Sequence, residues 1–152
     1  MRRISVAEHQ VRALTNQSGM YERIFASRRD EWNLLTVALD TLGASAAALT
    51  HFESCGLGSD VDERYIRLYG LFQAVILQQD AISAIYDIYV GSKQILEESA
   101  WQQCRRLRNL AVGHPLDARG GAGQGKLRVF LSRTTITESG FDLLICQKNE
   151  PS

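Results

Sequence analysis

Residues 65–89 read YIRLYGLFQAVILQQDAISAIYDIY, and this segment is apolar on most sides when it is wound as a helix. Asp60 and Asp62 stand just before it, where the positive end of a helix dipole favours acidic side chains. The pattern predicts a helix from about residue 60 to about Tyr89. A helix that is apolar nearly all round must be covered by other elements, so we expect it to be the central helix.

Further helices are predicted on both sides of this segment. Ser5 and Glu8 have the spacing of a capping box, which predicts that a helix starts at Ser5. Apolar residues recur at helical spacing over residues 29–51, and CGLGSD at 55–60 has the composition of a loop. After a break at VGSKQ, a last helix is expected to continue to about Val112.

The helical pattern does not return after Pro115. Residues 116–125, LDARGGAGQG, have the composition of a flexible loop. Apolar residues then alternate with polar ones in two runs within residues 126–148, which predicts a β-hairpin. The expected fold is therefore all-α, an antiparallel bundle of four to five helices over residues 1–115 with a small C-terminal β-hairpin attached to it.

The composition is that of one globular domain. The 152 residues are 45% apolar and 22% charged, with a formal net charge of zero. No apolar run approaches the roughly 20 residues that span a bilayer, and the first residues lack a signal sequence. Three cysteines lie far apart and form no metal-binding pattern: Cys55, Cys104 and Cys146. We expect a cytoplasmic protein with no membrane segment, metal or cofactor.

Charge is distributed unevenly along the chain. Residues 31–100 hold ten acidic residues against three basic ones, whereas residues 101–133 hold seven basic residues against one acidic residue. A local basic excess is typical of a segment that meets an anionic ligand. Three of its arginines are the candidate phosphate contacts: Arg105, Arg106 and Arg119.

Residues 104–115, CRRLRNLAVGHP, carry the candidate chemistry. Arg105, Arg108 and Asn109 have the i, i+3, i+4 spacing that places side chains on one face of a helix. On an unbroken helix, His114 would point about 120° away from Arg108. The four residues share a site only if the helix fails before His114.

Two residues predict that failure. Gly113 is of the type that ends helices by adopting a positive φ, and Pro115 disfavours helical geometry at His114. His114 is then able to turn toward Arg108. An arginine that grips a phosphate, an asparagine that orients a neighbour and a histidine that moves a proton suit phosphodiester chemistry without a metal. In the alternative interpretation, His114 binds the last helix carbonyls and the arginines are surface residues.

Asp80 interrupts the apolar central helix beside Gln78 and Gln79. A buried carboxylate needs a partner, and an arginine from the last helix is the natural one, so Asp80 is a candidate supporting residue. The alternative is that all three residues face solvent on one polar stripe.

Residues 108–115, RNLAVGHP, resemble the signature of the HEPN superfamily, in which an arginine and a polar residue precede a histidine near the end of the last core helix of a four-helix bundle. Arg108, Asn109 and His114 match these positions. Many HEPN domains are metal-independent endoribonucleases of toxin–antitoxin, abortive-infection and CRISPR systems, with a composite site between two domains. The resemblance implies that Arg108 and His114 are catalytic, that Asn109 supports them, and that the chain cleaves RNA as a homodimer.

Other HEPN domains are non-catalytic and bind a partner protein or a nucleotide. The resemblance therefore leaves a second expectation, an interaction domain that pairs with an antitoxin or effector protein. A basic groove joining two Arg108/His114 pairs would favour the ribonuclease, and a motif buried under its own hairpin would favour the interaction domain.

Overall fold

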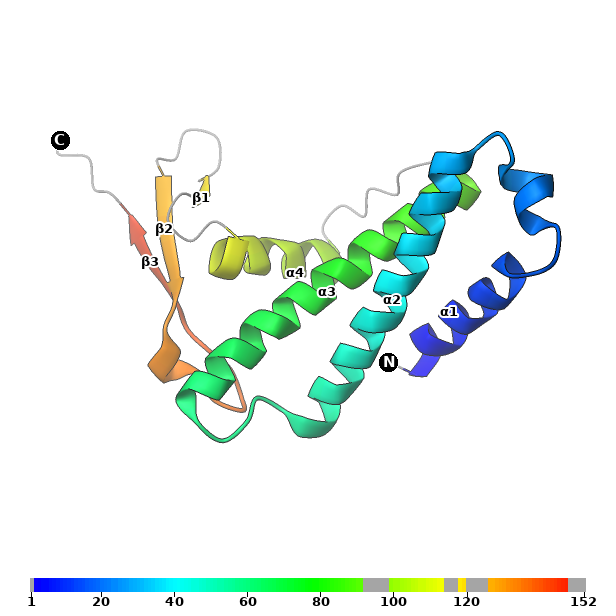
Figure 1. The fold of residues 1–152 in the computed structure, drawn as a ribbon. Coiled ribbons are helices and arrows are strands. Elements are labelled where there is room, and N and C mark those ends of the chain that lie inside the picture. Colours follow the sequence, from blue (N-terminus) through cyan, green and yellow to red (C-terminus); the bar gives the residue numbers. More distant parts are fainter. Residues whose placement is uncertain (1, 92–98, 114–117, 120–125, 148–152) are drawn as a thin grey trace. The chain divides into compact units, whose positions relative to one another are not determined.

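The computed structural model describes residues 2–91, 99–113, 118–119 and 126–147. Its α-helices, labelled in Figure 1, are α1 (Arg2–Thr15), α2 (Arg29–Cys55), α3 (Val61–Val90) and α4 (Ala100–Arg108). Two π-helical segments accompany them, Tyr21–Phe25 before α2 and Asn109–Gly113 directly after α4. The strands are β1 (Ala118–Arg119), β2 (Lys126–Leu131) and β3 (Leu143–Gln147). The predicted fold class, helical with a small C-terminal hairpin, is confirmed.

The chain divides into two compact units. Unit 1 comprises Met1–Ser54 and Ala74–Ile95, and unit 2 comprises Cys55–Gln73 and Leu96–Ser152. The division falls within α3, so the first part of this helix belongs to unit 2 and the rest to unit 1. Because α3 supplies side chains to the cores of both units, it has the central role that its apolar sequence predicts.

The core of unit 1 forms around α2. Phe25 and Leu35 are completely buried and pack with Leu39 and with Ile88 of α3. The Trp32 ring lies edge-on to that of Tyr21, with 5.3 Å between their centroids, and is tilted against that of Phe25 at 5.4 Å. These aromatic contacts hold the first π segment against α2.

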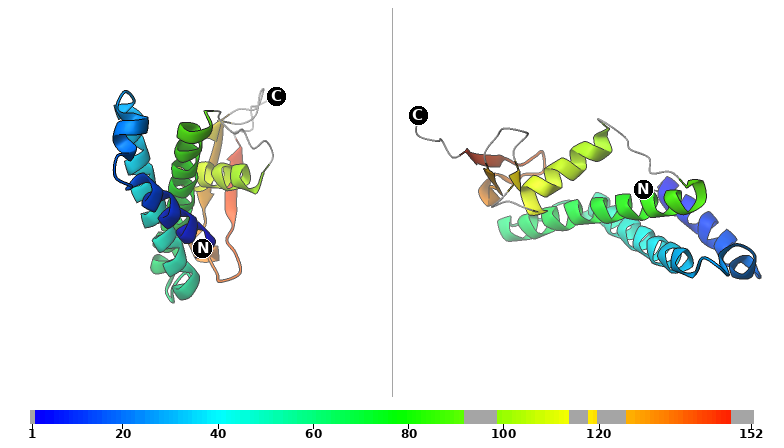
Figure 2. Two further views of the ribbon diagram at one scale, coloured as in Figure 1. Left: turned by 90° about the vertical axis from the view of Figure 1, so that its right-hand side faces the viewer. Right: turned by 90° about the horizontal axis from the view of Figure 1, so that it is seen from above.

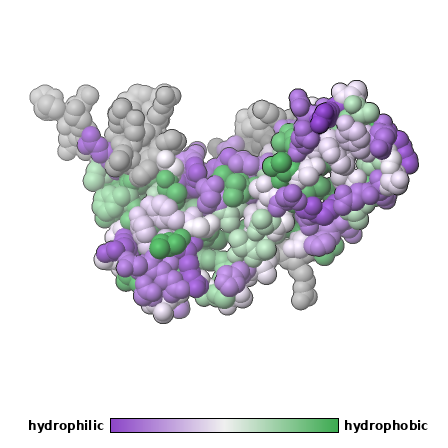
Figure 3. All heavy atoms as spheres, viewed as in Figure 1, coloured by the Kyte–Doolittle hydropathy of each residue, from purple (hydrophilic) through white to green (hydrophobic). Residues whose placement is uncertain are grey.

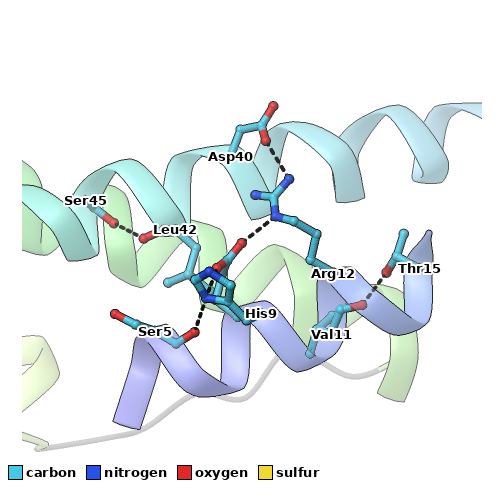
Figure 4. A network of polar contacts seen from close by, with 9 residues as sticks. Ser5, His9, Val11, Arg12, Thr15, Asp40, Leu42 and Ser45 are labelled. Atoms are coloured by element: carbon cyan, nitrogen blue, oxygen red, sulfur yellow. Dashed lines mark hydrogen bonds and ion pairs between the residues drawn. The ribbon is translucent and has the colours of Figure 1, made fainter. Parts of the chain in front are cut away.

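A polar network joins α1 to α2 (Figure 4). Arg12 Nε donates to Glu8 Oε1 at 2.6 Å, and Arg12 Nη1 donates to Asp40 Oδ1 at 2.9 Å. The hydrogen bond with Glu8, followed by that with Asp40, raises the pKa of the Arg12 guanidinium. Glu8 is only 5% exposed, so Arg12 neutralises a buried carboxylate and also links the two helices.

The predicted helix start at Ser5 is wrong. α1 begins at Arg2, and the Ser5 carbonyl accepts a hydrogen bond from His9 Nδ1 at 2.7 Å inside the helix (Figure 4). Glu8 turns toward Arg12 instead of capping the helix. An i, i+4 pair within α1 therefore uses the carboxylate that the capping-box spacing had assigned to the N-terminus.

The boundaries of α2 and α3 follow local chemistry. Asp60 Oδ1 accepts from the backbone N–H groups of Asp62 and Glu63, each at 2.9 Å, which confirms the predicted start of α3. Gly91, with a φ of 75°, ends this helix. α2 extends to Cys55, beyond the predicted end at residue 51, before the loop that contains Gly56.

By length and composition alone, α2 could cross a membrane, contrary to the expectation that no segment is long and apolar enough. A core helix of a water-soluble protein has the same composition. Leu35, Leu39 and Leu42 of α2 pack inside unit 1.

The sheet of unit 2 packs on α3. β2 lies between β1 and β3, both antiparallel to it, and Figure 2 shows β2 and β3 side by side. Leu131 of β2 packs with Leu68 of α3, and the rings of Phe72 and Phe141 meet edge to face at 5.6 Å. Hydrophobic residues also reach the surface in separate places on the face drawn in Figure 3. Phe130 of β2 is among the hydrophobic residues that are exposed to solvent.

β1 lies where a loop was expected. Ala118 pairs with Leu127 and Arg119 pairs with Lys126, so these two residues extend the hairpin to three strands. Composition misses this strand because backbone pairing with β2, not side-chain pattern, defines it. The other residues of the predicted loop, 116–117 and 120–125, lie outside the described residues.

We predict that Arg12→Met lowers the free energy of unfolding by about 2–3 kcal/mol, because the buried Glu8 carboxylate loses its guanidinium partner. Asp40→Asn, at the exposed end of the same network, should cost less than about 1 kcal/mol. Urea unfolding measures both values. The double variant Glu8→Gln with Arg12→Met should recover part of the loss, and strictly additive losses would contradict the pairing.

Candidate functional site

The candidate site lies at the end of α4. Ser99 begins this helix as its N-cap, with Ser99 Oγ accepting from the Gln102 N–H at 3.3 Å. The last turn of α4, directly before the π turn that continues the helix, carries three arginines: Arg105, Arg106 and Arg108.

The helix continues past Arg108 as a π turn, Asn109–Gly113. Gly113 is still helical, whereas positive φ values among the described glycines occur at Gly19, Gly56, Gly58 and Gly91. The expectation that Gly113 ends the helix through a positive φ is therefore wrong. In π geometry the backbone repeats over five residues rather than four, which moves Gly113 onto the side of the helix where Arg108 lies.

Gly113 has a steric role instead. A Cβ atom at this position would lie 2.8 Å from Arg108 Nη1 and 3.5 Å from Asn109 Oδ1. Only a residue without a side chain lets the guanidinium lie this close to the backbone. The spacing of the arginine and the glycine, five residues apart, is the sequence signal for this contact.

Two neutral amide groups hold the Arg108 guanidinium. Nη2 donates to Gln73 Oε1 of α3 at 3.0 Å, and Nη1 donates to Asn109 Oδ1 at 3.1 Å. Arg108 Nε is buried and has no acceptor among the described residues. Among the described residues, Arg108 forms no ion pair. The guanidinium is thus fixed in place without a described carboxylate to balance its charge.

The structure brings together some of the predicted site residues. Arg108 and Asn109 are in direct contact, and Asn109 is exposed to solvent. On α4, Arg106 is exposed and Arg105 is half-buried. Their roles in binding and catalysis stay predictions.

Two predicted residues cannot be placed in the site. His114 lies outside the described residues, although it is bonded to Gly113. The backbone of Arg119 forms β1, while its side chain is also outside the description.

Asp80 does not have the buried position expected of it. Its side chain is exposed, whereas those of Gln78 and Gln79 are buried in α3. The alternative, in which all three residues face solvent, is confirmed for Asp80 and wrong for the two glutamines. Asp80 belongs to unit 1 and α4 to unit 2, so the pairing of Asp80 with an arginine stays a prediction.

A pair of tyrosines adds to the site and was missed in the sequence. The Tyr69 hydroxyl donates to the carbonyl oxygen of Ala111 in the π turn at 3.3 Å. The Tyr65 hydroxyl lies 2.9 Å from that of Tyr69, with 4.7 Å between the ring centroids. Burial, followed by the hydrogen bond with Tyr65, raises the pKa of Tyr69 to about 12. The signal for this contact is the four-residue spacing of Tyr65, Tyr69 and Gln73 on α3.

One side of the π turn is covered. β2 packs against the turn, and both Ala111 and Val129 are almost completely inaccessible to solvent. Asn109 remains exposed on the same turn. The motif is therefore partly covered by its own hairpin and partly open to solvent.

Comparison of the chain with protein-family models, with curated proteins and with solved structures gives no match. Within the described ranges, no group of three histidine, cysteine or acidic side chains could hold a metal ion.

We predict that Gly113→Ala displaces the Arg108 guanidinium, because the added methyl group would lie 2.8 Å from Nη1. The matched control is Gly70→Ala in α3, where a Cβ meets no atom within 4 Å. The control should stabilise the fold by about 0.5–1 kcal/mol through its higher helix propensity. Gly113→Ala should lose that gain in urea unfolding, and an equal gain at both positions would contradict the steric role.

We also predict that Tyr69 lowers the free energy of unfolding at alkaline pH. Its raised pKa means that the folded state keeps a proton that the unfolded state releases above about pH 10. Stability should therefore fall as pH rises from about 10 toward about 12, and Tyr69→Phe should reduce that slope. Unfolding at several pH values measures the slope, and identical slopes in the two proteins would contradict the assignment.

Proposed function

We propose that this chain is a HEPN-type endoribonuclease that cleaves RNA without a metal, as a homodimer, in bacterial defence or toxin–antitoxin biology. The observation that carries the proposal is the position of the Arg108 guanidinium, which neutral groups hold against Asn109 and Gly113. Gly113 directly precedes His114 in the sequence. A fixed cation without a described carboxylate partner is suited to a phosphate, and guanidinium geometry matches two phosphate oxygens.

In the proposed reaction, the RNA 2′-hydroxyl attacks the adjacent phosphorus. A new O–P bond forms, the bond to the 5′-oxygen breaks, and the products carry a 2′,3′-cyclic phosphate and a 5′-hydroxyl. Arg108 stabilises the charge on the phosphate oxygens. His114 takes the proton from the 2′-hydroxyl or gives one to the leaving 5′-oxygen, a role that suits a side chain with a pKa near neutrality.

A homodimer follows from the number of histidines this reaction uses. One motif offers one histidine, whereas the reaction needs both a base and an acid. A C2 dimer with α4 near its axis brings two motifs together. Arg105, Arg106 and Arg119 would then contact the RNA strand, and an antitoxin or effector protein could regulate access to it.

The test is cleavage of a mixed RNA pool in the presence of EDTA. His114→Ala should abolish cleavage and leave RNA binding largely intact, because a neutral histidine adds little to phosphate affinity. Arg108→Ala should weaken both, with a flatter dependence of binding on salt. The products should carry 2′,3′-cyclic phosphate ends, and a 2′-deoxy substitution at the cleaved position should block the reaction.

Several results would contradict the proposal. Cleavage that survives in both variants would come from another site or another protein. Cleavage that is lost in EDTA would exclude the metal-free mechanism. A strict monomer in light scattering at micromolar concentration, without RNA, would contradict the composite site.

The second candidate is a non-catalytic interaction domain that binds a partner protein or nucleotide. β2 covers the Ala111 side of the motif, and Arg108 already donates two hydrogen bonds within its own chain. Both observations suit a motif whose role is structural. A purified dimer that binds such a partner and cuts no RNA would favour this candidate.

A further inference from the structure

Two side chains on one face of α3 hold the π turn. Tyr69 and Gln73 are four residues apart, which places them one above the other on the helix. Gln73 Oε1 accepts from Arg108 Nη2 at 3.0 Å, just before the turn. The Tyr69 hydroxyl donates to the Ala111 carbonyl at 3.3 Å, in the middle of the turn. α3 therefore binds the segment at two points.

The hydrogen bonds of the tyrosines have a fixed direction. A hydroxyl group has one proton, and Tyr69 uses its proton for the Ala111 carbonyl. Tyr65 must then donate to Tyr69 across the 2.9 Å between their oxygens. Successive hydrogen bonds polarise and strengthen one another. The relay gives the Ala111 carbonyl a side-chain partner.

The register of the turn decides which residue lies beside Arg108. In an α-helix, five residues turn the chain by about 500°, which would place residue 113 about 140° away from Arg108. The π register instead brings Gly113 against the guanidinium, where a Cβ would lie 2.8 Å from Nη1.

We infer that Tyr69 and Gln73 are positioning residues that keep Asn109–Gly113 in π register and so hold the Arg108 guanidinium against Gly113. The catalytic consequence rests on the proposed ribonuclease function. The π register itself does not rest on that function. NMR of the 152-residue chain reports on the register through two signals, the Gly113 amide and the Arg108 Nε–H.

The first experiment compares Tyr69→Phe with Tyr65→Phe. Each change removes one hydroxyl and keeps the ring, but only Tyr69→Phe removes the bond to Ala111. Tyr69→Phe should shift both NMR signals and lower kcat for RNA cleavage at least about tenfold, since small misplacements are costly in catalysis. Tyr65→Phe should leave both signals near their wild-type positions and change kcat by less than about threefold.

The second experiment compares Gln73→Leu with Gln73→Glu. Leucine cannot accept from the guanidinium, so Arg108 should move and kcat should fall. Glutamate keeps an acceptor for Nη2, so the Arg108 signal should stay close to its wild-type position. The new carboxylate balances the charge of Arg108, however, so KM for RNA should rise and the salt dependence of binding should flatten. If Gln73 only stabilised the fold, the variants would change the melting temperature, but Gln73→Leu would not act on kcat and Gln73→Glu on KM.

The outcomes separate the inference from the proposed function. If the wild-type protein cuts no RNA, the proposed function fails and the NMR comparison alone decides the register. Signals that are the same in Tyr69→Phe and Tyr65→Phe would overturn the inference. Signals that shift in Tyr69→Phe while kcat stays at its wild-type value would overturn the positioning role. A shift with a loss of kcat in Tyr69→Phe alone, in a protein with unchanged circular dichroism, supports it.

Discussion

The structure depends on the need to cover α3, a helix that is apolar around most of its circumference. Water cannot solvate such a surface favourably, so other elements must pack against it along its length. α2 and the first π segment cover the part that belongs to unit 1, through Phe25, Leu35 and Leu39. The hairpin covers the part that belongs to unit 2, through Leu131 and its neighbours. One helix thereby supplies the core of two compact units.

The same helix organises the candidate site through its polar side chains. Tyr69 and Gln73 extend from α3 to the end of α4, where Arg108 lies among neutral hydrogen-bond acceptors. A guanidinium held by amides keeps its full attraction for an anion, whereas one paired with a carboxylate would lose most of it. The contacts that stabilise unit 2 therefore also maintain a cation in a form suited to phosphate. The hydrogen bonds of Arg108 therefore agree with both candidate functions, the ribonuclease and the interaction domain. The two differ at His114, which only the ribonuclease needs for proton transfer.

Much of the fold could be predicted from the sequence because the signals are local. Asp60 caps α3 through its own side chain, and Gly91 ends that helix in a conformation that glycine adopts at no steric cost. The alternation of apolar residues likewise predicted β2 and β3, whose residues pair in register from Leu127 with Gln147 to Leu131 with Leu143. The start of α1 was missed because Glu8 forms an i, i+4 pair with Arg12 inside the helix instead of capping it. β1 was missed because its strand character comes from its partner.

By itself, the sequence determined the order of the helices, the hairpin and the places of Arg108 and Asn109 near the end of the last helix, because neighbouring residues on one chain carry each of these features. Only the tertiary structure decided that the helix reaches Gly113 in π register and that Tyr69 and Gln73 bind the segment there. Gly113 is permissive in conformation, so its own identity does not choose between ending a helix and continuing it. The hydrogen bonds that the segment receives come from Gln73, 35 positions before Arg108, and from Tyr69, 42 positions before Ala111, and no local pattern around Gly113 encodes them.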